Sequence, residues 1–268
     1  MKALVRALAQ VLTGGALVLL ARGARAQQDD QVYHWETPDT GWFELQMLNA
    51  FVLASDTPYR RFSGAETRQG LEQHFVEVEY GLTDRWSAGV YADFELPPSD
   101  TFRYSGVRVE SNYRLFDRYQ RIVELALHAE VLVPRPSSGA GEELETRLIL
   151  QRDFSDLRVI ANPGFALPLS GDTSEGIEFS VAAGIYYRRF WRVQPALEYF
   201  AEFGSVAEPS PASEQRHVLY PGARVYLAPG LSWLVSVGIG LNDASDRWLL
   251  RGLLSYEFPT VRPADQMR

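Results

Sequence analysis

The sequence has 268 residues, contains no cysteine and carries a formal net charge of −8 at pH 7. The lack of cysteine excludes disulfides, thiol catalysis and thiolate metal sites. An acidic chain is a poor partner for nucleic acid, whose phosphates attract basic surfaces. After Leu20 no segment approaches the roughly 18 consecutive apolar residues of a membrane-spanning helix.

The first residues have the pattern of a secretory signal peptide. Lys2 and Arg6 precede an apolar run from Ala7 to Leu20, and Ala24-Arg25-Ala26 places small residues before a cleavage site. This pattern predicts a cleaved signal peptide over residues 1–26. A membrane anchor is the alternative, but the run is short and contains two glycines.

Residues 27–40 form a polar stretch with Pro38 and the acids Asp29, Asp30, Glu36 and Asp39. We expect a loosely held periplasmic segment here. The acids lack the spacing of a calcium-binding loop, so no metal site and no cofactor are predicted.

From Gly41 onward apolar and polar residues alternate. In the clearest stretch, every second residue from Ile177 to Tyr187 is apolar, and the pattern repeats from Trp191 to Phe203 after a short turn. Period two is typical of strands with one apolar face. The predicted strands cover approximately residues 42–53, 71–82, 86–96, 107–115, 119–133, 143–151, 157–167, 177–187, 191–203, 217–227, 233–241 and 248–258. Pro163 argues against strand 157–167, because proline cannot donate to a ladder.

The links between these strands fall into two alternating classes. Short links are expected at residues 83–85, 116–118, 154–156, 188–190 and 228–230, and longer links at 54–70, 97–101, 134–141, 168–176, 204–216 and 242–246. Aromatic residues such as Trp86, Trp191 and Trp233 lie beside the short links. Short turns at one end, long loops at the other and an aromatic girdle are typical of outer-membrane barrels.

The expected fold is therefore all-β. Residues 41–258 form a single transmembrane antiparallel up-and-down β-barrel of about twelve strands, followed by a periplasmic tail over 259–268. We expect it in the outer membrane of a Gram-negative bacterium, with both termini periplasmic. Its expected partners are outer-membrane lipid, lipopolysaccharide and the barrel-assembly machinery. A secreted soluble β protein is the alternative fold.

The polar positions of the alternation predict the side chains that line the lumen. They are Glu77, Glu79, Asp93, Glu95, Arg108, Glu110, Arg114, Glu124, His128, Glu130, Glu143, Glu145, Arg147, Glu178, Arg192, Glu198, Glu202 and Arg251. Acids outnumber arginines in this set, which favours the passage of cations or neutral small solutes.

Two other functions remain open. The inward charges could instead pair and fill the barrel, leaving a structural or surface-interaction protein whose loops 54–70 and 204–216 bind a partner. A barrel lipase would need a serine and a histidine near the outer rim. His74 is the one candidate base, but it has no neighbouring serine in a nucleophile motif. The sequence therefore predicts no enzyme.

Three short motifs carry a family resemblance. They are Glu36-Thr37-Pro38-Asp39-Thr40, the turn from Tyr80 to Trp86, and Leu197-Glu198-Tyr199 with Gly204. They resemble the outer-membrane family named for the MetA pathway of phenol degradation. The resemblance implies a barrel that moves small organic molecules, aromatic ones among them, across the outer membrane. Many such barrels end on an aromatic residue that aids assembly, whereas here ten residues follow Phe258.

Overall fold

The computed structural model describes residues 30–62, 64–171, 173 and 176–259. The predicted signal peptide over 1–26 lies outside the described residues, as does nearly all of the predicted tail. In the described ranges, no helix has the length and apolar character needed to cross a membrane.

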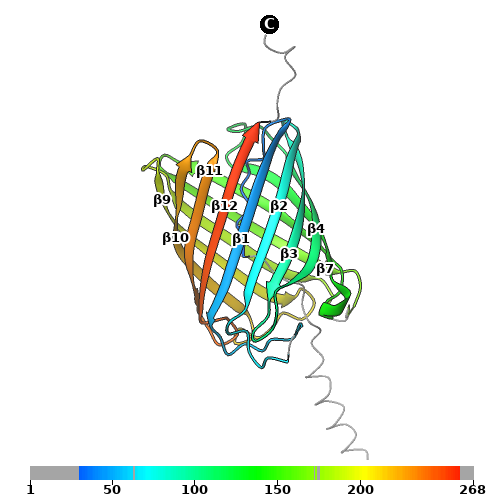
Figure 1. Ribbon diagram of the computed structural model, residues 1–268. Coiled ribbons are helices and arrows are strands. Elements are labelled where there is room, and N and C mark those ends of the chain that lie inside the picture. The colour runs from blue at the N-terminus through cyan, green and yellow to red at the C-terminus, as the bar shows by residue number, and fades with distance from the viewer. Residues whose placement is uncertain (1–29, 63, 172, 174–175, 260–268) are drawn as a thin grey trace, which may run out of the picture.

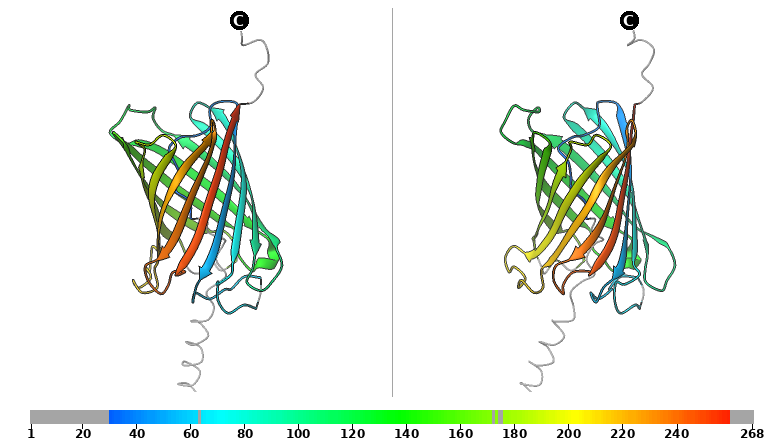
Figure 2. Two further views of the ribbon diagram at one scale, coloured as in Figure 1. Left: turned by 60° about the vertical axis from the view of Figure 1, so that its left-hand side comes forward. Right: turned by 90° about the vertical axis from the view of Figure 1, so that its left-hand side faces the viewer.

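Twelve antiparallel strands in the described part of the chain form one closed barrel (Figure 1). Each strand pairs with its sequence neighbours, and β12 pairs with β1 to close the sheet. Figure 2 shows the strands tilted around the barrel axis from two further sides. The strands are β1 (Trp42–Ala54), β2 (Glu72–Thr83), β3 (Trp86–Leu96), β4 (Arg103–Arg114), β5 (Glu124–Pro134), β6 (Glu143–Phe154), β7 (Leu157–Pro168), β8 (Glu178–Tyr187), β9 (Val193–Ser205), β10 (Arg216–Ala228), β11 (Leu231–Gly240) and β12 (Trp248–Pro259). The predicted barrel of twelve strands is confirmed.

The link between β4 and β5 differs from the predicted three-residue turn. It runs over residues 115–123, because β5 begins at Glu124 rather than at Tyr119. Tyr119 has a φ of 64° in the left-handed region, which a strand residue does not adopt. Tyr119 and Ile122 are both exposed beyond the strand ends. The alternation therefore continues in the sequence past the point where the ladder stops.

Pro163 lies within β7 and interrupts only one of its two ladders. The pairing of β7 with β6 lapses between Gly164 and Ala161, whereas the pairing with β8 continues through Pro163 and Val181. Because proline lacks the amide donor, the gap falls where a ladder bond would be missing. The neighbouring Asn162 side chain binds inside the barrel, as described below.

The outer surface is apolar over a wide band. Val78, Val90, Val109 and Val131 are direct cross-strand neighbours on β2 to β5, and all four are exposed. A contiguous apolar face of this kind is unfavourable in water and is typical of barrel surfaces in contact with lipid.

The interior is packed toward the end of the barrel that carries the long loops. Its largest cluster of buried apolar residues includes Leu48, Phe75, Val218 and Leu249 from the wall. The loop between β1 and β2 contributes Tyr59, whose hydroxyl donates to Glu95. This loop also places Arg61 3.2 Å from the Glu95 carboxylate. The long-loop end of the lumen is therefore partly filled by the chain itself.

Candidate functional site

Most of the side chains predicted to face the lumen are buried on the inner face of the barrel. The buried ones are Glu77, Glu79, Asp93, Glu95, Arg108, Glu110, Glu124, His128, Glu130, Arg147, Glu198 and Arg251. The half-buried ones are Arg114, Glu143, Glu145, Glu178 and Glu202. Arg192 is an exception, because it precedes β9 and is exposed with its guanidinium 4.5 Å from the ring centre of Trp191. Arg192 lies in the link before β9 rather than on the strand, so the alternation does not place its side chain.

Six carboxylates lie side by side across neighbouring strands. Glu44 of β1 is directly opposite both Glu257 of β12 and Glu79 of β2. On β3 the residue opposite Glu79 is Gly89. The same register continues from Gly89 to Glu110 of β4, Glu130 of β5 and Glu145 of β6. We call this set the acidic row: Glu257, Glu44, Glu79, Glu110, Glu130 and Glu145. Like charges directly opposite each other destabilise a sheet, so the row does not serve stability alone.

Other inward charges form ion pairs inside the barrel. The Arg108 guanidinium lies 2.8 Å from Asp93 and 3.3 Å from Glu130. Arg251 pairs with Glu198, and Arg147 pairs with Glu145. These pairs offset part of the acidic charge and hold side chains of neighbouring strands together.

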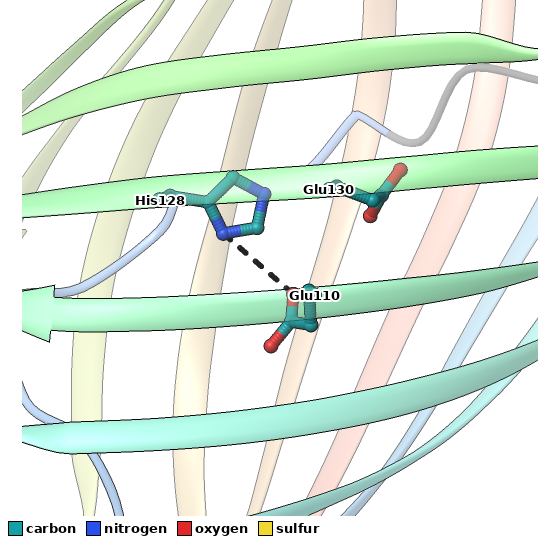
Figure 3. Close-up of side chains that lie close together, drawn as sticks. All are labelled: Glu110, His128 and Glu130. Atoms are coloured by element: carbon teal, nitrogen blue, oxygen red, sulfur yellow. Dashed lines mark ion pairs between the residues drawn. The ribbon is translucent and has the colours of Figure 1, made fainter.

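His128 lies close to two of these acids, Glu110 on the neighbouring strand and Glu130 on its own (Figure 3). Its Nδ1 atom is 2.8 Å from Asn112 Oδ1 and 3.7 Å from Glu110, while Glu130 follows on the same strand. The ring centre of His128 is 4.1 Å from that of Tyr33. Tyr33 belongs to the N-terminal segment, which therefore reaches the middle of the lumen wall.

Residues 30–40, which we call the N-terminal segment, lie inside the barrel. Val32, Tyr33 and Trp35 are buried there. The Asn162 side chain accepts from Tyr33 N at 2.8 Å and donates to Tyr33 O at 3.1 Å. Trp35 N donates to Gln151 at 3.1 Å, and its indole nitrogen donates to Leu125 O at 3.2 Å. The structure corrects the prediction of a loosely held segment, because the aromatic side chains and backbone amides of residues 30–40 have partners on the lumen wall.

Charged groups hold the N-terminal segment at two points. Asp30 lies 2.5 Å from Arg216 and accepts from the Tyr220 hydroxyl, and Glu36 lies 2.6 Å from Arg158. Burial opposes the charge on Asp30 and Glu36, but the adjacent Arg216 and Arg158 hold the pKa of each carboxyl below its ordinary value. The segment is therefore held chiefly by ion pairs and hydrogen bonds to the wall.

A cavity of about 490 Å³ lies beside the N-terminal segment. Its acidic wall includes Glu44, Glu79 and Glu257 of the acidic row, and Gly230 places it near a short turn. Arg158 of β7, Arg188 of the link after β8 and Arg224 of β10 also line the cavity. The lining of the cavity therefore contains acidic and basic side chains, together with residues of the N-terminal segment.

Several important lumen residues are absent from the predicted set. Glu44, Arg158 and Arg224 occupy inward positions of β1, β7 and β10, and strict alternation along those strands could have identified them. Arg216 at the start of β10 could have been found in the same way. Nothing in the local sequence signals that Tyr59 or Trp35 enters the barrel, since their partners are distant in the chain.

His74, the candidate catalytic base, faces outward. Its Nδ1 atom lies 2.7 Å from Asn49 Oδ1, and its Nε2 atom lies 3.5 Å from Glu72. The next outward residue along β2 is Val76, so the strand does not place a serine beside the histidine there. The His74 environment thus supplies a polar pair without an adjacent nucleophile on its own strand.

Comparison with solved structures finds porin and channel barrels. The KdgM porin aligns with a TM-score of 0.55 and 8% identity, over 80% of this chain and 99% of its own. The NanC porin aligns with a TM-score of 0.53 and 12% identity, over 81% and 100%. An outer membrane channel from Pseudomonas putida F1 aligns with a TM-score of 0.56 and 11% identity, over 87% and 100%. At these identities the likeness establishes the barrel fold.

No family model and no curated protein matches the chain. The resemblance to the family named for the MetA pathway is therefore not confirmed.

Proposed function

We propose that the protein is an outer-membrane channel for small solutes whose lumen is obstructed by its own N-terminal segment in the described conformation. The observation that carries the proposal is the polar cavity of about 490 Å³ beside a segment held by ion pairs and hydrogen bonds. A cavity of this size lies within the roughly 300–1,000 Å³ range of small-molecule sites.

The outer membrane is the proposed location. The exposed apolar band on the barrel exterior supports contact with lipid, and the closed sheet leaves no edge to be satisfied in a bilayer. The predicted signal peptide supports export. Lipopolysaccharide and the barrel-assembly machinery are the proposed partners, and both termini are proposed to be periplasmic.

Passage requires the N-terminal segment to move. Val32, Tyr33 and Trp35 occupy the lumen, and Asp30 reaches Arg216 at the long-loop end. Each charged group of these ion pairs can exchange its partner for water or for a charged solute, so the segment can leave the lumen without breaking a covalent bond. The segment is therefore suited to act as a removable obstruction.

The solute class follows from the charges. The acidic row faces the cavity at Glu44, Glu79 and Glu257, which attracts cations and repels anions. Aromatic side chains such as Tyr91 and Tyr226 also line the cavity. We propose small organic solutes, neutral or cationic and including aromatic ones, as the cargo.

Planar-bilayer recording of the refolded full chain tests this function, with solute uptake into liposomes as a second readout. We expect discrete currents and uptake of small neutral or cationic organic solutes. Heat-denatured protein in the same detergent is the control. Correctly folded protein that gives neither current nor uptake would contradict the proposal.

A second candidate function is a structural or surface-interaction barrel with a permanently plugged lumen. The packed cluster around Tyr59, Phe75 and Val218 favours it, because this cluster fills the long-loop end. In that case loops 54–70 and 204–216 would bind a partner. Absent conductance combined with normal folding is the result expected for this candidate.

A further inference from the structure

Three glutamate side chains converge on the lumen wall. Glu77 and Glu79 come from β2 and Glu110 from β4, and each offers a carboxylate oxygen within 4.8 Å of the others. All three are buried, and all three line the cavity. Solvent from the cavity therefore has access to the cluster.

Glu77 is the unusual member. Its side chain is 1% exposed, and apart from the neighbouring Glu110 carboxyl no hydrogen-bond partner among the described residues reaches its carboxylate oxygens. Two buried carboxylates in contact are unfavourable by several kcal/mol unless a proton or a cation is held between them. The contact between the Glu77 and Glu110 carboxyls therefore points to a positively charged partner at this place.

The backbone makes room for the cluster at Gly89 of β3. A Cβ atom at this position would lie 3.0 Å from Glu77 Oε1 and 3.0 Å from Glu110 Cγ. Glycine thus lets the two carboxylates approach over the intervening strand. A larger residue at position 89 would push them apart.

Neutral donors orient the other two acids. Glu79 accepts from the Ser87 hydroxyl at 2.5 Å and the Asn112 amide at 3.0 Å. Glu110 accepts from the same amide at 3.0 Å and from the Tyr91 hydroxyl at 3.1 Å. These bonds hold the carboxylates in place beside the cavity, while Arg108 forms ion pairs with Asp93 and Glu130.

We propose that Glu77, Glu79 and Glu110 bind a divalent cation, with Ca²⁺ as the preferred ion. Hard cations take carboxylate oxygens, and Ca²⁺ tolerates an irregular set completed by water, which the cavity supplies. We do not include His128 among the ligands, because its Nδ1 atom is engaged with Asn112 Oδ1 at 2.8 Å and lies 3.7 Å from Glu110 (Figure 3). The bound ion stabilises β2 against β4 across Gly89 and reduces the repulsion within the acidic row.

Isothermal titration of the refolded full chain with CaCl₂ tests the site, in a detergent free of lipopolysaccharide and at pH 7.5. We expect one Ca²⁺ to bind per barrel, and we expect Glu77→Gln to lower the affinity at least tenfold. Glu145→Gln is the matched control, because it removes the same charge from the acidic row outside the cluster and should leave the affinity unchanged.

Absence of Ca²⁺ binding to the folded wild-type chain would overturn the proposal, as would equal weakening in both variants. If Glu77→Gln fails to fold, Gly89→Ala provides the second variant, and we expect it to lower the Ca²⁺ affinity at least threefold. The test is independent of the proposed channel, because a barrel that conducts nothing can still bind the ion, and a conducting barrel can fail to bind it.

Discussion

Arg251 joins the barrel wall to the N-terminal segment through a single side chain. It pairs with Glu198, donates to the backbone oxygen of Asp30 and lies 4.3 Å from the ring centre of Tyr220. Both members of the Arg251–Glu198 pair are 2% exposed. Loss of the arginine would leave a buried carboxylate without its counter-charge.

The Arg251→Met variant should therefore lower the free energy of unfolding by about 3 kcal/mol. Urea titration of the refolded protein, followed by tryptophan fluorescence, measures the change. Arg247→Met is the matched control, since Arg247 pairs with Asp56 where both side chains are well exposed, and its effect should stay within about 0.5 kcal/mol. Equal effects of the two variants would show that the buried pair is not structurally important.

At the scale of the element, the N-terminal segment depends on one close backbone approach. A Cβ atom on Gly81 of β2 would lie 2.2 Å from the backbone oxygen of Asp39. Gly41 N also donates to Gly81 O at 2.8 Å, so the segment leaves the lumen directly over this glycine. A side chain at position 81 would therefore force the backbone of the segment to move.

We predict that Gly81→Ala displaces the N-terminal segment and exposes it to protease. Limited proteolysis of the refolded barrel should cut residues 30–40 at least fivefold faster than in the wild type. Gly64→Ala is the control, because a Cβ atom at Gly64 meets nothing within 4 Å. Unchanged cleavage in Gly81→Ala would mean that the segment is not held at this point.

The wall of the barrel was predictable from the sequence, whereas the N-terminal segment was not. The face on which Glu77 lies follows from period two, which is a local property of the strand. Trp35, by contrast, binds Gln151, which lies 116 residues further along the chain. No local pattern encodes such a contact. The predicted strands extend past their observed ends to Arg192 and Tyr119 for a related reason, since strand ends depend on turn geometry as well as on alternation.

At the scale of the whole molecule, charge is distributed unevenly around the lumen. The acidic row spans β12, β1, β2, β4, β5 and β6, whereas Arg158, Arg188 and Arg224 reach the cavity from β7, the link after β8, and β10. The acids Asp30 and Glu36 of the segment lie against Arg216 and Arg158. Displacement of the segment would therefore change the charge that a solute meets.

Ion selectivity provides the corresponding prediction. The double variant Glu44→Gln and Glu257→Gln removes two carboxylates from the cavity wall, so the preference for K⁺ over Cl⁻ should fall at least twofold. The reversal potential in a KCl gradient measures this preference. Glu66→Gln with Glu142→Gln removes the same charge from exposed loop positions and should leave the potential unchanged. Equal shifts would assign selectivity to the net charge rather than to the cavity.

The most direct test of the central claim is to tether the N-terminal segment and record the current. The wild-type chain has no cysteine, so Asp30→Cys with Arg216→Cys introduces the only two thiols, at positions now joined by an ion pair. A short thiol-cleavable crosslinker then fixes the segment in the lumen. We predict that crosslinking abolishes the single-channel current of this variant and that cleavage restores it. The same current before and after crosslinking would contradict the account, as would no current in either state.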